Sequence, residues 1–93
     1  SLGANAIFNF LKNEEISMLA EGLNIFRIDV PQRLVGKDLA HSGIREVTDC
    51  SVVAIQVGGE MIINPDPTMP ISAGSELVLI GTDEGEKKFL ESF

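Results

Sequence analysis

The sequence predicts an α+β domain: a small mixed β-sheet of about four strands with a short crossover helix and a C-terminal helix. Two observations carry this prediction. Short apolar runs rich in Val and Ile, separated by Gly or Pro, recur along the chain and are typical of strands. Near the C-terminus the aromatic residues are instead spaced four apart, which is the period of one helix face.

The chain has 93 residues, enough for one domain and too few for two independent cores. Its hydrophobic fraction of 44% is too high for a disordered tail, and without Trp or Tyr the core must be mainly aliphatic. The chain starts at Ser1 rather than Met, so we expect a fragment of a longer protein. We expect residues 1–23 to form linker helices or an arm, and residues 24–93 to form the domain.

Seven basic and 14 acidic residues give a net charge of −7. A field of this sign repels phosphate backbones, so we expect no nucleic-acid partner. No apolar stretch approaches the ~20 residues of a membrane span. The single cysteine, Cys50, excludes an internal disulfide and indicates a reducing compartment.

The N-terminal residues predict two helical segments. Residues 2–11 place Ile7 and Leu11 four apart on one apolar stripe, and residues 14–20 repeat such a stripe more briefly. The same residues could equally be an arm that packs against a partner.

Three strands follow from local patterns. Residues 24–30 alternate apolar and polar, which predicts a half-buried strand that ends at Pro31. Residues 51–57 are almost continuously apolar and β-branched, which favours a strand buried on both faces. Gly58-Gly59 joins this strand to residues 60–63, which predicts a hairpin with a type I′ turn.

The segments that connect the strands also have recognisable sequence patterns. Residues 37–42 predict a short helix, and Gly43 suits the left-handed position that closes it. Residues 44–49 are expected to be a polar connector. Residues 64–70 hold three of the four prolines and predict an irregular crossing loop. A fourth strand is expected over residues 76–80.

The last helix is expected to start with a capping box made by Asp83 and Glu86. Phe89, Leu90 and Phe93 would form its inner face, because they lie within one turn of one another.

No arrangement typical of catalysis is present. His41 is the single histidine, and Ser42 beside it has no triad meaning because neighbours on a helix point about 100° apart. Cys50 opens a buried strand, without a His or cationic cluster to activate it, which favours an inert core thiol. No glycine-rich phosphate loop occurs. We therefore expect that the protein is not an enzyme.

One Cys and one His cannot make a zinc site. Asp83, Glu84 and Glu86 cluster at a helix start, where either capping or a hard-cation site explains them; we favour capping. We expect neither a metal site nor a cofactor.

Arg45 is the candidate binding residue because it lies beside apolar Leu39, Ala40, Ile44 and Val52. Either it covers this surface with its stem, or its planar fork anchors an anionic ligand or a partner carboxylate.

An ordered set of short motifs runs through the chain. Residues 34–39 fit L-x-G-x-x-L, and a segment ending in Arg45 follows. Residues 48–55 end in V-x-A-I, and residues 73–82 fit G-D-x-L-x-x-x-G with Ser75 in the place of Asp. This set resembles the C-terminal regulatory subdomain of proteins that regulate potassium conductance, the RCK-C or TrkA-C family. The resemblance covers the chain from Phe26 to Phe93.

The resemblance implies a TrkA-C-like fold, a two-fold homodimer and a regulatory role. Family members bind small effectors, such as cyclic di-AMP or a divalent cation, and pass the change to a membrane pore. The implied partners are a nucleotide-binding RCK-N half and the pore of a potassium channel or cation transporter. The implied location is the cytoplasmic side of the cell membrane, as part of a membrane protein.

The resemblance also implies a ligand site. The corresponding positions here are Leu39, Ala40, Gly43, Arg45, Ser51 and Val52, with Pro67 nearby. Gly43 replaces a usual acidic residue, Ser51 replaces an asparagine, and Gln56 replaces a common arginine. These departures keep an alternative open: a purely structural dimerisation module, with sensing in a missing nucleotide-binding half.

Overall fold

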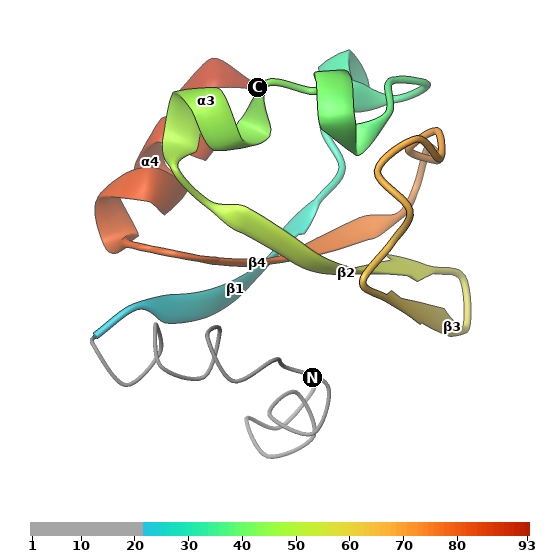
Figure 1. Cartoon of the computed structure of the whole chain (residues 1–93), viewed down its shortest axis with the longest axis horizontal. Coiled ribbons are helices and arrows are strands. Elements are labelled where there is room, and N and C mark those ends of the chain that lie inside the picture. The colour runs from blue at the N-terminus through green and yellow to red at the C-terminus, as the bar shows by residue number, and fades with distance from the viewer. Residues whose placement is uncertain (1–21) are drawn as a thin grey trace.

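The computed structural model describes residues 22–93, so both helical segments expected in the N-terminal arm lie outside the described residues. Four strands form one sheet in the order β1-β4-β2-β3 (Figure 1). The strands are β1 (Asn24–Asp29), β2 (Ser51–Val57), β3 (Glu60–Ile63) and β4 (Glu76–Gly81). The helices are the two 3-10 turns η1 (Gln32–Leu34) and η2 (Leu39–His41), followed by α3 (Ile44–Thr48) and α4 (Asp83–Ser92).

The sheet is antiparallel throughout, rather than mixed as the sequence led us to expect. β4 pairs antiparallel with both β1 and β2, and β2 pairs antiparallel with β3. β1 and β2 therefore run in the same direction, but β4 lies between them and separates them. The crossing loop after β3 places β4 there, which sequence periodicity alone does not reveal.

The β2–β3 hairpin forms with Val57 opposite Glu60, as expected. The turn type differs from the type I′ prediction. Only Gly58 has a positive φ, 56°, and Gly59 does not. A positive φ at the first central residue alone is the pattern of a type II′ turn, which also fits the twist of a hairpin.

The connection from β1 to β2 lies where the sequence predicted it, but its helices differ from the prediction. The short helix expected over residues 37–42 is the 3-10 turn η2, and α3 forms where a polar connector was predicted. Gly43 takes the expected left-handed conformation, with φ 80°, but it precedes α3 as its N-cap. Ile44 and Thr48, four apart, are the buried residues of α3, so packing stabilises a helix too short to form on its own.

The start of α4 is one residue earlier than the predicted capping box. The Thr82 hydroxyl accepts a 2.9 Å hydrogen bond from the Gly85 amide, so Thr82 is the N-cap and Asp83 is already helical. Phe89 is fully buried, whereas Leu90 is 65% exposed and does not belong to the inner face. Phe93 contacts Phe89 with the ring centroids 5.2 Å apart.

The helices pack against one face of the sheet (Figure 1). This layer joins Ile28, Ile55, Leu77 and Leu79 of the strands to residues of the helices and loops, chiefly Leu34, Ile44, Ile71 and Phe89. Leu34, Leu77, Leu79 and Phe89 have no exposed surface. Their burial removes large apolar areas from water, which is the main force holding the two layers together.

A close contact at the end of β4 gives a first prediction. A Cβ added at Gly81 would lie 2.5 Å from the Cys50 Sγ atom, closer than side chains tolerate. Gly81→Ala should therefore lower the free energy of unfolding by about 1–3 kcal/mol, the usual cost of overpacking a core. Urea denaturation measures the change.

Gly59→Ala is the matched control, because nothing lies within 4 Å of a Cβ there. Adding Cys50→Ala to Gly81→Ala removes the Sγ atom and should recover part of the loss. Equal stability of the two Gly→Ala variants would contradict the close packing of Gly81 on Cys50.

Candidate functional site

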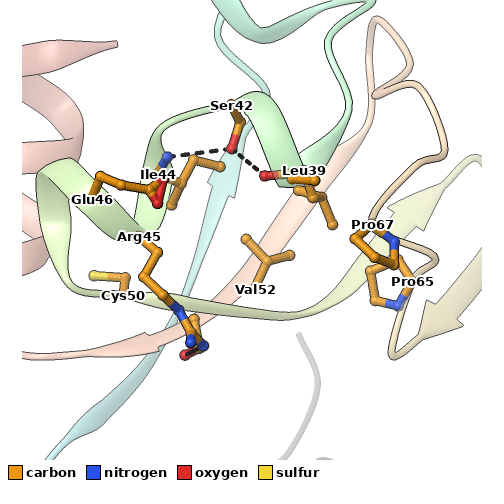
Figure 2. Close-up of a pocket in the computed structure, with 11 residues that line it drawn as sticks. Leu39, Ser42, Ile44, Arg45, Glu46, Cys50, Val52, Pro65 and Pro67 are labelled. Atoms are coloured by element: carbon orange, nitrogen blue, oxygen red, sulfur yellow. Dashed lines mark hydrogen bonds between the residues drawn. The ribbon is translucent and has the colours of Figure 1, made fainter.

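A cavity of about 380 Å³ opens between η2 and α3, the start of β2 and the loop of residues 64–70, here called the proline loop (Figure 2). This volume lies at the lower end of the range for small-molecule sites, roughly 300–1,000 Å³. The residues that line it are Leu39, Ala40, Ser42, Ile44, Arg45, Glu46, Cys50, Ser51, Val52, Pro65 and Pro67.

One wall is fixed by contacts between η2 and the proline loop. The Asp38 side chain caps η2 by accepting a 2.8 Å hydrogen bond from the His41 amide. The Ala40 amide then donates to the Pro67 carbonyl at 3.0 Å. These contacts hold Leu39 and Pro67 at the same edge of the cavity, although they are far apart in the sequence.

Ser42 forms the corner between η2 and α3. Its buried hydroxyl donates to the Leu39 carbonyl at 2.9 Å and accepts from the Ile44 amide at 3.3 Å. With Gly43 in the left-handed conformation, this pair of hydrogen bonds turns the chain sharply into α3. The turn places Arg45 one residue after the buried Ile44, at the cavity.

Arg45 supplies the positive charge of the cavity. Its Nη2 atom donates to the Ser51 hydroxyl at 2.8 Å, and the side chain is exposed. Within residues 22–93, this is the single hydrogen bond that its side chain makes, so the guanidinium keeps donors available to a ligand. Glu46 adds one carboxylate at the rim, so the cavity is not strongly charged overall.

The rest of the lining is apolar. Figure 2 shows Val52 between Arg45 on one side and Pro65 and Pro67 on the other. Cys50 is only 1% exposed, and its thiol lies 3.6 Å from the Thr48 carbonyl, so it behaves as the core residue that the sequence predicted. A ligand with one anionic group and one flat apolar part fits such a lining.

All six residues expected at the binding site line this one cavity: Leu39, Ala40, Arg45, Ser51, Val52 and Pro67. Gly43, which the resemblance also implied, does not line it but shapes the turn. Gln56 lies outside the cavity, and its side-chain amide donates to the Gly58 carbonyl at 2.8 Å.

Of the other five lining residues, sequence reasoning named Ile44 only as a neighbour of Arg45, and it missed Ser42, Glu46, Cys50 and Pro65. Ser42 had a readable signal, because a serine three residues after Leu39 and just before a glycine is typical of a hydroxyl that closes a turn. Cys50 had none, since a buried thiol beside Gly81 and Gly85 looks like any other core residue in the sequence.

The other candidate residues lie elsewhere. His41 is on the surface, with 84% of its side chain exposed, and its Nδ1 atom lies 2.8 Å from the Asp38 carboxylate. Asp83 accepts a 2.6 Å hydrogen bond from the Asn24 side chain. Across residues 22–93, no three His, Cys, Asp or Glu side chains are placed to hold a metal ion together. None of the helices in this part of the chain is both long and apolar enough to cross a membrane.

Residues 23–93 match the TrkA-C domain. The chain belongs to the TrkA-C family. The resemblance seen in the sequence is thus confirmed over the whole described domain.

Solved structures agree with this TrkA-C assignment. The RCK domain of GsuK is 38% identical over 95% of this chain, with a TM-score of 0.75. The GsuK channel bound to NAD gives 37% identity over 96% of the chain and a TM-score of 0.77. These matches cover only 20% and 17% of the two GsuK chains, so this chain spans a fifth or less of the length of the chains it matches.

More distant structures share the fold alone. The RCK C domain of the potassium transport protein KtrA, in complex with c-di-AMP, is 22% identical over 98% of this chain and the whole of that chain, with a TM-score of 0.76. S. agalactiae BusR in complex with its busA-promotor DNA is 19% identical over 84% of this chain and 47% of that chain, with a TM-score of 0.64. A search of proteins with curated descriptions gave no match.

The proline loop of this TrkA-C domain gives a pH prediction. The Thr68 amide and the Thr68 hydroxyl donate to the Asp66 carboxylate at 2.9 and 2.7 Å. These hydrogen bonds favour the charged carboxylate, so they lower the pKa of Asp66 from its ordinary value of 3.8. Because the folded pKa is lowered, the stabilisation is present above pH 3.8 and is lost as the pH falls through the lowered value. Asp66→Asn should therefore be less stable than wild type at neutral pH, with the difference shrinking in acid.

Urea denaturation of both proteins from neutral pH to below pH 3.8 measures this difference. Thr68→Val removes the hydroxyl donor and keeps the amide donor, so it should reproduce part of the effect. A difference between wild type and Asp66→Asn that stays constant with pH would contradict the assignment.

Proposed function

We propose that this TrkA-C domain is a dimer-forming, ligand-sensing regulatory domain of a potassium channel or related cation transporter. The observation that carries the proposal is one cavity lined by all six expected residues, with Arg45 at one side. The similarity to GsuK, at 38% identity over 95% of the chain, supports a potassium channel as the parent protein. In this role the domain acts on the cytoplasmic side of the membrane and is not an enzyme.

The cavity suits one half of a cyclic dinucleotide. The Arg45 fork matches a phosphate, and the apolar lining near Val52 and Pro67 matches the face of a base. A two-fold dimer of the domain presents two such cavities, and cyclic di-AMP has two phosphates and two identical bases. The complex of the KtrA RCK C domain with c-di-AMP supports this choice of ligand.

The proposed mechanism is a thermodynamic coupling between ligand binding and the arrangement of the dimer. A ligand that bridges two copies favours one arrangement of the dimer, and it shifts gating only by its difference in affinity between arrangements. Such couplings are typically ~1–3 kcal/mol, or about 5–150-fold. In the parent protein an RCK-N half would pass this change to the pore.

The Arg45 guanidinium provides the direct test. Cyclic di-AMP should raise the melting temperature of the wild-type domain, because a ligand that binds only the folded state stabilises it. Arg45→Ala should weaken binding by roughly 10–150-fold, corresponding to the loss of one or two hydrogen bonds to a charged group, ~1.5–3 kcal/mol. Thermal shift over a titration of cyclic di-AMP measures both.

Arg33→Ala is the matched control, because Arg33 is also an exposed arginine on a short helix but does not line the cavity. It should titrate like wild type. If Arg45→Ala also titrates like wild type, the site assignment is wrong. If wild type shows no shift with cyclic di-AMP, NAD or Ca²⁺, sensing does not reside in this domain.

The second candidate is a structural dimerisation module, with sensing in a separate nucleotide-binding half. Gly43, Ser51 and Gln56 favour it, because each departs from the pattern of family members that bind a ligand. In addition, the hydrogen bond from Arg45 to Ser51 already uses one donor of the guanidinium.

Solution mass separates dimerisation from sensing. Light scattering should give twice the 10.0 kDa mass of one chain without ligand, since both candidate functions require a dimer. A monomer that dimerises only with cyclic di-AMP would instead favour sensing and exclude the structural module. A monomer under all conditions would count against both.

A further inference from the structure

Glu46 lies beside Arg45 at the same end of the cavity. The two are consecutive residues of α3, and both line the cavity. Figure 2 shows both on the α3 side, with Pro65 and Pro67 at the opposite end and Val52 in between. A carboxylate is therefore placed next to the guanidinium and away from the apolar end of the cavity.

The charges of Arg45 and Glu46 are not paired. Among residues 22–93, neither side chain forms an ion pair, with the other or with a third group. The Arg45 side chain instead reaches β2, where its Nη2 atom donates to the Ser51 hydroxyl at 2.8 Å. Glu46 is exposed, so its two carboxylate oxygens are available to accept hydrogen bonds from a ligand.

A carboxylate at this position selects among anionic ligands. A phosphate bound to Arg45 carries the same sign of charge as Glu46, and like charges at short distance repel. A carboxylate accepts hydrogen bonds and donates none. A ligand that binds Arg45 through a phosphate therefore binds best if it also carries a hydroxyl or amine donor close to that phosphate.

Cyclic di-AMP has one kind of donor in this place. Its exocyclic amines lie at the outer edge of the bases, whose faces match the apolar end near Val52 and Pro67. Each ribose 2′-hydroxyl, in contrast, is on the carbon next to the one that is esterified to phosphate. Acidic side chains accept from this hydroxyl in dinucleotide sites, and it is the group that distinguishes ribose from deoxyribose.

We propose that Glu46 is a specificity-determining residue, which accepts a hydrogen bond from the ribose 2′-hydroxyl of a cyclic dinucleotide whose phosphate binds Arg45. The pair then recognises a phosphate and its neighbouring hydroxyl together. A ligand without that hydroxyl keeps the repulsion from Glu46 and loses the hydrogen bond. This inference rests on the proposed function and adds a residue that the family resemblance did not imply.

A solvated charge without a role in recognition gives a different result. Such a Glu46 would repel the phosphates of every cyclic dinucleotide, with or without the 2′-hydroxyl. Its removal would then tighten the binding of all of them by the same factor. The ratio of affinities for a ribose and a deoxyribose ligand therefore separates recognition from repulsion, and a general loss of stability does not change this ratio.

Calorimetric titration of the full chain with cyclic di-AMP and with its 2′-deoxyribose analogue tests the proposal. Wild type should bind cyclic di-AMP about 10-fold more tightly than the analogue, the lower value expected for one hydrogen bond to a charged group. In Glu46→Gln this ratio should fall several-fold, because a neutral amide oxygen is a weaker acceptor than a carboxylate. The analogue itself should bind Glu46→Gln at least as tightly as wild type, since the repulsion is gone.

Glu84→Gln is the matched control. It removes the same charge from an exposed glutamate in the first turn of α4, and Glu84 does not line the cavity. This variant should keep the wild-type ratio of affinities.

The possible results separate this inference from the proposed function. Equal affinity of wild type for the two ligands, with both weakened by Arg45→Ala, would overturn the role of Glu46 and leave the cavity as the ligand site. A wild-type ratio that persists in Glu46→Gln would also overturn it. If wild type binds neither ligand, cyclic di-AMP is the wrong ligand, and the inference fails together with that part of the proposed function.

Discussion

The central place of β4 is the constraint on which the rest of the structure depends. This strand pairs along its length with both β1 and β2, and its residues from Leu77 to Ile80 are 0–1% exposed. Leu77 and Leu79 anchor the helical layer, while Val78 and Ile80 anchor the opposite cluster. Because β4 contributes side chains to the apolar clusters on both faces, a displacement of its backbone changes the packing of both clusters.

The cavity is a consequence of how the chain crosses from β1 to β2. With β4 between these strands, the connection must pass over the helical face, and it does so through η1, η2 and α3. The crossing leaves a gap between η2, the first residues of β2 and the loop that later returns to β4. Prolines stiffen that loop, and backbone hydrogen bonds from Gly36 and Ala40 fasten it to the crossover.

The six residues that the family resemblance implied line one cavity, and most of them are concentrated in two short segments. Leu39, Ala40 and Arg45 lie in the crossover and Ser51 and Val52 open β2, so the family pattern identified them together. Pro67 came from the distant loop only through that resemblance. The sequence did not reveal α3, because the buried pair Ile44 and Thr48 is too short a repeat to stand out from a polar connector. It also misassigned Leu90, since three apolar residues within one turn do not show which of them the sheet covers.

The sequence by itself determined which segments are strands, where the chain turns and that the core is aliphatic. These properties follow from side-chain period, β-branching and the backbone freedom of Gly and Pro, which act over a few residues. Only the tertiary structure decided the strand order, the antiparallel sheet and the type II′ turn at Gly58. Those features depend on which distant strands pair and how they twist, and the energy of such pairing is shared by residues that the sequence keeps far apart.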